Sequence, residues 1–121
     1  MKNQPLRARL GFAIDGLRIA WNGESSFRTH CLAAALVAAV LLALRPGGPW
    51  CALVALTTGA VLAAELFNTS LEHLLDRLHP ERHPAVQAAK DCAAAAVLVL
   101  AITAVLVFVG MLWAVLPARL A

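Results

Sequence analysis

The sequence predicts an all-α integral membrane protein with three transmembrane helices and an N-terminal amphipathic surface helix. Hydrophobic residues make up 61% of the 121 residues and charged residues only 14%, with a mean hydropathy of +0.77. A soluble domain is about 25% charged, and a chain this short cannot hide so many apolar side chains in one core. Three long apolar runs bounded by turn residues indicate that lipid covers them instead. We expect one membrane domain over residues 1–121.

Residues 6–22 are predicted to form the amphipathic helix. Its apolar face follows the helical spacing i, i+4, i+8, i+11 and i+15: Leu6, Leu10, Ile14, Leu17 and Trp21. Arg7, Asp15 and Arg18 lie on the opposite side. A helix of this kind lies in the membrane interface, with the indole ring at headgroup depth. An ordinary soluble helix is the alternative.

The first membrane helix is predicted over residues 27–44. The Asn-Gly pair at 22–23 indicates a break before it, and Ser25 or Ser26 could cap its first turn. The apolar part alone is short for a hydrocarbon core of about 30 Å. We therefore expect Arg28 to lie within the helix and to extend its guanidinium to the interface.

Two further membrane helices are predicted over residues 50–78 and 85–116. The Arg-Pro-Gly-Gly-Pro stretch at 45–49 is a turn between the first and second helices. The second helix ends at His79-Pro80, because the residue before a proline disfavours helix. The third contains the longest uncharged run, from Cys92 to Leu116.

Basic residues predict the orientation of these helices. Eight lie before the uncharged run of the first membrane helix or between the uncharged runs of the second and third: Lys2, Arg7, Arg9, Arg18, Arg28, Arg77, Arg82 and Lys90. Only Arg45 and Arg119 lie on the other side. Because positive loops stay in the cytoplasm, the N-terminus should be cytoplasmic and the C-terminus should face outward.

Polar residues gather on one face of the second membrane helix, near its cytoplasmic end. Glu65, Asn68, Glu72 and Asp76 fall within an arc of about 80° at helical spacing. Glu65 has only apolar neighbours in the sequence, and an ionised carboxylate at membrane depth is costly unless it is paired or metal-bound. This face is therefore the predicted location of the chemistry.

Other charged residues should lie at the same membrane level as this face. Glu24 precedes the first membrane helix, and Lys90 and Asp91 begin the third. Glu24 and Glu72 could hold Mg²⁺, and Lys90 could neutralise a transferring phosphoryl group. Asn68 could donate to a phosphate or orient the deep carboxylate. These are the parts that phosphoryl transfer needs, although neither a Walker A motif nor the protein-kinase motifs occur.

Other classes of function fit the sequence less well. An ion- or proton-conducting membrane protein would also use buried carboxylates, but it would leave Glu24, Lys90 and Asp91 unexplained. An assembly subunit without chemistry would leave Glu65 as an uncompensated cost. A nucleic-acid partner is not indicated, because the net charge is only +3 and no basic stripe alternates with aromatic residues. The three cysteines lack metal-binding spacing.

The same residues carry a resemblance to a known family. The segment ELFNTSLEHLLD at 65–76, His83-Pro84 and the Ala-Lys-Asp at 89–91 resemble the signature of the prokaryotic diacylglycerol kinase family. The resemblance extends to Ala20-Trp21, to Glu-Ser-Ser-Phe-Arg at 24–28 and to the layout of three spans. It thus covers essentially the whole chain.

This resemblance implies a homotrimeric lipid kinase of the bacterial cytoplasmic (inner) membrane. It would use MgATP to phosphorylate a lipid alcohol at the cytoplasmic face. Carried over by position, Glu65 would be the general base, and Glu24 and Glu72 would hold the metal with the ATP phosphates. The remaining residues that would contact substrate or ATP are Asn68, Asp76, Lys90 and Asp91.

The resemblance leaves the lipid open, because the family has a diacylglycerol branch and an undecaprenol branch. Four stretches are closer to the undecaprenol branch: Asn68-Thr69, Glu72-His73, His83-Pro84 and Asp91-Cys-Ala-Ala. The Asp76-Arg77 pair is closer to the diacylglycerol branch. His30 stands where the diacylglycerol branch often has an acid.

Overall fold

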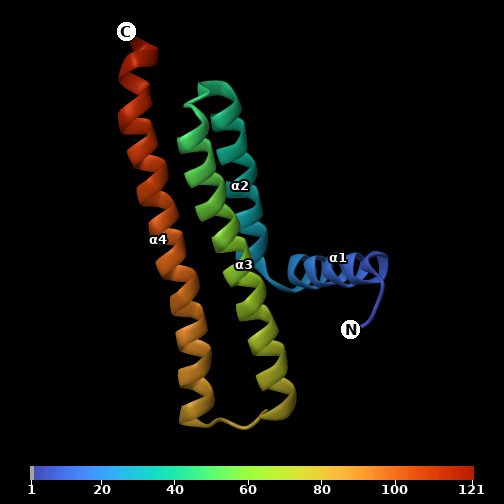
Figure 1. Cartoon of the computed structure of the whole chain (residues 1–121). Coiled ribbons are helices and arrows are strands. Elements are labelled where there is room, and N and C mark those ends of the chain that lie inside the picture. Colours follow the sequence, from blue (N-terminus) through green and yellow to red (C-terminus); the bar gives the residue numbers. More distant parts are fainter. Residues whose placement is uncertain (1) are drawn as a thin grey trace.

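The computed structural model describes residues 2–121, which form four helices (Figure 1). In chain order these are α1 (Leu6–Gly23), α2 (Ser25–Leu44), α3 (Gly48–Leu78) and α4 (Pro84–Leu120). Helices α2, α3 and α4 run alongside one another, and α1 projects sideways from the start of α2, away from α4 (Figure 1). Each of the three aligned helices is long and apolar enough to cross a membrane. The predicted all-α class with three spans and a less apolar first helix is confirmed.

Each of the four helices differs from its predicted range by one to four residues at one or both ends. The break expected at residues 22–23 is wrong, because α1 continues through Gly23 and only Glu24 separates it from α2. Neither Ser25 nor Ser26 caps α2, whose N-terminal position is taken by Glu24 without a side-chain hydrogen bond. The last helix passes Pro117 and ends at Leu120. A proline in the last turn removes only one backbone hydrogen bond from a long helix.

Helix α3 packs mainly against α4. Val54 of α3 and Met111 of α4 are the largest fully buried side chains among the described residues. A Cβ atom placed on Gly110 would lie 3.9 Å from the Trp50 ring, so the two helices approach closely at this level. Most other apolar side chains of the spans, such as Leu36, are exposed in the single chain. Such outward-facing surfaces are expected where lipid or another membrane helix is the neighbour.

The connection between α2 and α3 is tight and lies at one end of the bundle. Arg45 has a left-handed backbone with φ 46°, and Gly47 has φ 104°, a region that glycine enters without a steric cost. The Arg119 guanidinium donates a hydrogen bond of 2.8 Å to the Arg45 carbonyl oxygen. The end of α4 therefore lies beside this turn, and the two basic residues assigned to the outer side share one end of the molecule.

The junction of α1 and α2 is closely held. The Glu24 amide donates to the Ala20 carbonyl at 2.9 Å, and the Arg28 guanidinium donates to the Trp21 carbonyl at 2.5 Å. Ala20 and Phe27 are buried at this junction. The orientation of α1 is thus fixed by the first turn of α2. Leu10 and Leu17 on the predicted apolar face of α1 are exposed, as a lipid-facing side chain would be.

Candidate active site

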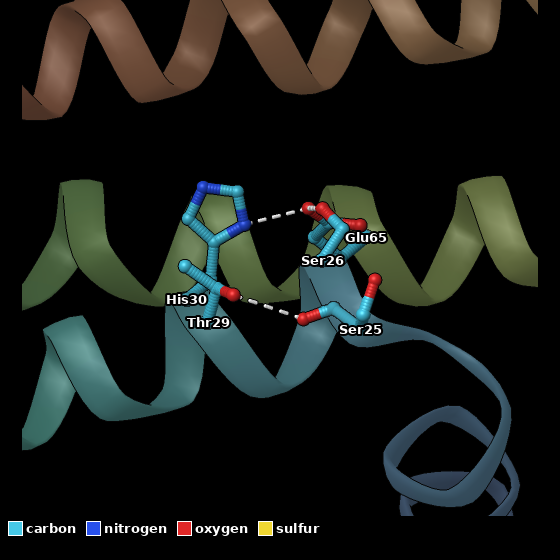
Figure 2. A network of polar contacts seen from close by, with 5 residues as sticks. All are labelled: Ser25, Ser26, Thr29, His30 and Glu65. Carbon is cyan, nitrogen blue, oxygen red and sulfur yellow. Dashed lines mark hydrogen bonds and ion pairs between the residues drawn. The ribbon is translucent and has the colours of Figure 1, made fainter.

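Glu65 is the most deeply buried ionisable side chain of residues 2–121, at 3% exposed. It lies on α3, and its carboxylate meets two side chains of α2 (Figure 2). The Ser26 hydroxyl donates to Oε1 of Glu65 at 2.5 Å, and Nδ1 of His30 lies 2.6 Å from the same oxygen. The burial of an unpartnered Glu65 carboxylate would be costly, and Ser26 and His30 provide its partners. Neither Ser26 nor His30 was predicted as a site residue.

The hairpin of α2 and α3 explains why these side chains meet. Ser26 is 20 positions before Pro46, and Glu65 is 19 positions after it, so an antiparallel hairpin with a tight turn places them opposite each other. His30 follows Ser26 by four residues and lies on the same face of α2. The nearly equal distances of Ser26 and Glu65 from the Arg45–Gly47 turn are the signal in the sequence that could have identified Ser26 and, one turn later, His30.

One turn beyond Glu65, α3 carries two polar side chains without partners. Oδ1 of Asn68 and Oγ1 of Thr69 are buried, and neither has a hydrogen-bond partner within the described chain. Buried polar atoms are nearly always hydrogen-bonded, and each exception calls for an explanation. These two atoms are available to a bound molecule close to Glu65. Asn68 was predicted as a site residue, and Thr69 was not.

A second polar group lies where α3 ends and α4 begins. Nζ of Lys90 lies 2.5 Å from Oδ1 of Asp76, and the Gln87 amide donates to Oδ1 of Asp91 at 2.8 Å. Asp76 and Lys90 line an open polar cleft of about 590 Å³. Its other polar residues are His79, Glu81, Arg82, His83 and Gln87. A cation and a carboxylate thus face a space large enough for part of a small molecule.

The structure spreads the predicted site residues along α3 rather than gathering them at one point. Asp76 is 11 positions beyond Glu65, which corresponds to about 16 Å along a helix. Glu72 lies between them and is half-buried, as is Glu24 just before α2. The predicted polar face is therefore continuous, with a deep carboxylate at one end and the Lys90–Asp76 pair at the other.

The two carboxylates predicted to bind metal are free to do so. The side chains of Glu24 and Glu72 form no hydrogen bond or ion pair with any other residue of the described chain. No group of three or more His, Cys, Asp or Glu side chains within residues 2–121 could hold a metal ion. This donor set does not fit an all-protein metal cage. It fits Mg²⁺, which one or two carboxylates commonly bind together with substrate phosphates and water.

Two histidines of the same region serve the helix ends. Nδ1 of His83 accepts a hydrogen bond of 3.1 Å from the Ala85 amide and so caps α4. His79 ends α3, and its Nδ1 lies 3.7 Å from Oε2 of Glu81. His73 lines a groove between α1 and α3. These placements account for the histidines of the loop without a metal.

An apolar cavity of about 190 Å³ lies between α2, α3 and α4. His30 lines it next to Glu65, and Thr58 is the other polar side chain in its wall. The remaining lining is aliphatic or aromatic, including Val54, Val61 and Phe108. The site thus places a buried carboxylate on a polar helix face, and its partner His30 lines an apolar cavity.

Comparison with known proteins adds independent information. A family model described as prokaryotic diacylglycerol kinase matches residues 11–112. The chain is 32% identical to diacylglycerol kinase of Escherichia coli (strain K12) over 103 residues, which cover 85% of this chain and 84% of the relative. It is 39% identical to diacylglycerol kinase of Synechocystis sp. over 99 residues, which cover 79% of this chain and 55% of the relative. It is 42% identical to undecaprenol kinase of Bacillus subtilis over 50 residues, which cover 41% of each chain.

Proposed function

The chain belongs to the prokaryotic diacylglycerol kinase family and is a membrane lipid kinase, and we propose that it transfers the γ-phosphoryl group of ATP to the hydroxyl of a membrane lipid alcohol. The observation that carries this proposal is the buried Glu65 carboxylate on the polar face of α3, in contact with His30, which lines the apolar cavity. The relatives reported above are named as kinases, and nothing in them favours the ion-conducting alternative.

Glu65 is the general base of this proposal. A lipid hydroxyl stays near the boundary between headgroups and hydrocarbon, so its proton acceptor must lie below the aqueous phase. The O–H bond of the lipid breaks, its proton passes to the Glu65 carboxylate, and a new O–P bond forms as ADP leaves. Ser26 and His30 hold the carboxylate in place for this step, and such positioning is the main contribution that a protein makes to phosphoryl transfer.

The nucleotide lies along the polar face of α3 in this proposal. Its γ-phosphate is near Glu65, and the rest extends toward the cleft at Asp76 and Lys90, a span that an extended nucleoside triphosphate covers. The Lys90 ammonium contacts the phosphates, and Asp76 and Asp91 complete the polar end of the site. The unpartnered Oδ1 of Asn68 contacts the substrate. The polar cleft and the buried, unpartnered amide support this arrangement.

Mg²⁺ is the cofactor of this proposal, and Glu24 and Glu72 would hold it together with the ATP phosphates. When bound, the ion would supply positive charge that offsets the negative charge of the phosphates. Glu24 and Glu72 come from different parts of the chain, and so they would also draw the start of α2 toward α3 around the nucleotide. Their freedom from other contacts supports this role.

We further propose that the kinase is a homotrimer in the bacterial inner membrane, with α1 and the 79–83 loop at the cytoplasmic face. The positive-inside rule supports the orientation, because eight of the ten basic residues lie on that side. ATP is cytoplasmic, and this orientation gives it access to the cleft at Lys90. The exposed apolar side chains of the spans leave ample surface for contacts with other copies.

Phosphate transfer to purified lipids tests the function directly. Diacylglycerol and undecaprenol are presented separately in mixed detergent micelles with γ-labelled ATP, since relatives are named for both lipids. Label should enter one lipid fraction in preference to the other, and that fraction identifies the substrate. The Glu65→Gln variant serves as the matched inactive control. A purified, folded enzyme that labels neither lipid would contradict the proposal.

A further inference from the structure

His30 is a candidate for a role in the reaction that the sequence did not suggest. We propose that His30 is a positioning residue, which occupies Oε1 of Glu65 and so leaves Oε2 as the oxygen that accepts the lipid proton. This inference rests on the proposed function, in which Glu65 is the general base. It adds which oxygen of the carboxylate reacts and which side chain selects that oxygen.

The two hydrogen bonds to Glu65 end on the same oxygen. Ser26 and His30 both contact Oε1, at 2.5 Å and 2.6 Å, and no hydrogen bond within residues 2–121 reaches Oε2. A carboxylate oxygen has about two sites for hydrogen bonds, so the two side chains of α2 fill Oε1. The remaining lone pairs of the carboxylate are on Oε2, and a proton from substrate must go there.

The chemistry of a general base decides which atom of His30 carries a hydrogen. Glu65 can accept a proton only as a carboxylate, and an ionised carboxylate only accepts hydrogen bonds. Nδ1 of His30 must therefore donate, whichever charge the ring has. The ring has few rotatable bonds and spans the gap from α2 to α3, whereas the Ser26 hydroxyl can rotate. The imidazole is thus the more rigid of the two contacts.

No other ionisable side chain of residues 2–121 forms a hydrogen bond with Glu65. The wall of the cavity beside His30 is apolar on α4, where it consists of Ala101, Ala104, Val105 and Phe108. Cys31 follows His30 on α2, and Glu72 is two turns away along α3. The His30 side chain is 28% exposed and that of Glu65 only 4%. His30 is therefore the ionisable neighbour that sets the orientation of this carboxylate.

Thr29 offers a matched control on the same turn of α2. Its hydroxyl donates to the Ser25 carbonyl at 3.0 Å and makes no contact with Glu65 (Figure 2). Thr29→Ala therefore removes a hydroxyl from the same turn without altering the proposed network. Its turnover should match that of the wild-type enzyme.

The test compares substitutions of His30 that keep or remove the donor. In His30→Asn the amide nitrogen takes the place of Nδ1, and in His30→Leu no donor remains. His30→Leu should lower kcat by about 10- to 100-fold, the range for a hydrogen bond to a charged group, without raising the KM for ATP. His30→Asn should restore most of the turnover. Should His30→Leu fail to fold, His30→Gln provides the same contrast, because its amide lies at the Nε2 position and should not rescue.

A double variant separates an effect through Glu65 from an independent one. If His30 acts only through Glu65, His30→Leu should cost no further turnover in the Glu65→Gln background. Three outcomes would each overturn the inference. The first is a wild-type kcat in His30→Leu, and the second is an equal loss of kcat in His30→Asn and His30→Leu. The third is a loss of kcat in the double variant that equals the sum of the two single losses in free energy. An active Glu65→Gln enzyme would instead overturn the proposed base itself. An inactive Glu65→Gln enzyme with a fully active His30→Leu enzyme would overturn the role of His30 alone.

Discussion

Nζ of Lys90 at the start of α4 lies 2.5 Å from Oδ1 of Asp76 near the end of α3. The pair joins the two longest helices just inside the 79–83 loop that connects them. Asp76 is largely exposed, and an exposed ion pair contributes only about 0.2–1 kcal/mol to stability. The pair is therefore better placed to orient the Lys90 ammonium than to hold the fold together.

Lys90→Met should weaken the use of ATP far more than it weakens the fold. Loss of a hydrogen bond to a charged phosphate is worth about 1.5–3 kcal/mol, so kcat/KM for ATP should fall by about 10- to 100-fold. Arg77→Met removes a neighbouring exposed cation and is the control. ATP titrations at saturating lipid measure the effect. Equal losses of kcat/KM in Lys90→Met and Arg77→Met would mean that only the net charge at this end of the molecule affects the use of ATP.

Glu65→Gln keeps the shape of the side chain and removes the base. A positioned base contributes about 10² to 10⁴ in rate, so turnover should fall by that factor while ATP still binds at Lys90 and Glu72. Asp15→Asn, which changes an exposed carboxylate of α1, is the control and should have normal turnover. Steady-state kinetics together with nucleotide binding separate the two effects. If Glu65→Gln keeps more than about a tenth of wild-type turnover, Glu65 is not the base.

Glu24→Gln and Glu72→Gln should both weaken the dependence on magnesium and lower turnover severely. Each substitution removes one of the two free carboxylates, and a neutral amide is a weaker ligand for a hard cation. The measurement is kcat as a function of Mg²⁺ concentration at fixed ATP. Asp15→Asn changes an exposed carboxylate of α1 that pairs only with Arg18, and it should leave the titration unchanged. A normal magnesium titration in Glu24→Gln would contradict the metal assignment.

Spin labels on α1 test whether it lies on the membrane surface. Labels at Leu10 and Leu17 should collide with a lipid-soluble relaxation agent, and labels at Arg7 and Arg18 should collide with a water-soluble one. The reason is the segregation of apolar and charged side chains around this helix. Enzyme reconstituted in vesicles gives the accessibility of all four positions. Uniform contact with water would show that α1 stands clear of the bilayer.

The helices could be predicted because each depends on local sequence. Apolar runs, the Arg45–Gly47 turn and the two His-Pro pairs fix the three spans to within a few residues. One prediction that failed concerned Ser26, which was one of two serines that could cap α2 and instead donates to Glu65. A serine near a helix start has both options, and the packing of α2 against α3 decides between them.

The site could be predicted only where its residues share a helix or flank a short loop. Glu65 and Asp76 lie on one helix, so periodicity places them on one face. Lys90 comes soon after that helix and meets Asp76 across the loop. His30 was not predicted, because its contact with Glu65 depends on the register of α2 against α3. Thr69 was not predicted, because its burial depends on where α1 packs against α3. Neither quantity is a property of a single segment.

The single residue between α1 and α2 links the position of α1 directly to the first turn of α2. Arg28 holds the end of α1, and Ser26, which touches Glu65, comes only two residues after Glu24. A bilayer that becomes thinner or thicker tilts the helices embedded in it. Because the junction is so short, a change in the angle between α1 and α2 would shift Ser26 relative to the Glu65 carboxylate. We therefore expect turnover to vary with acyl-chain length in reconstituted membranes at constant substrate, so that the thickness of the membrane governs how fast its own lipid is phosphorylated.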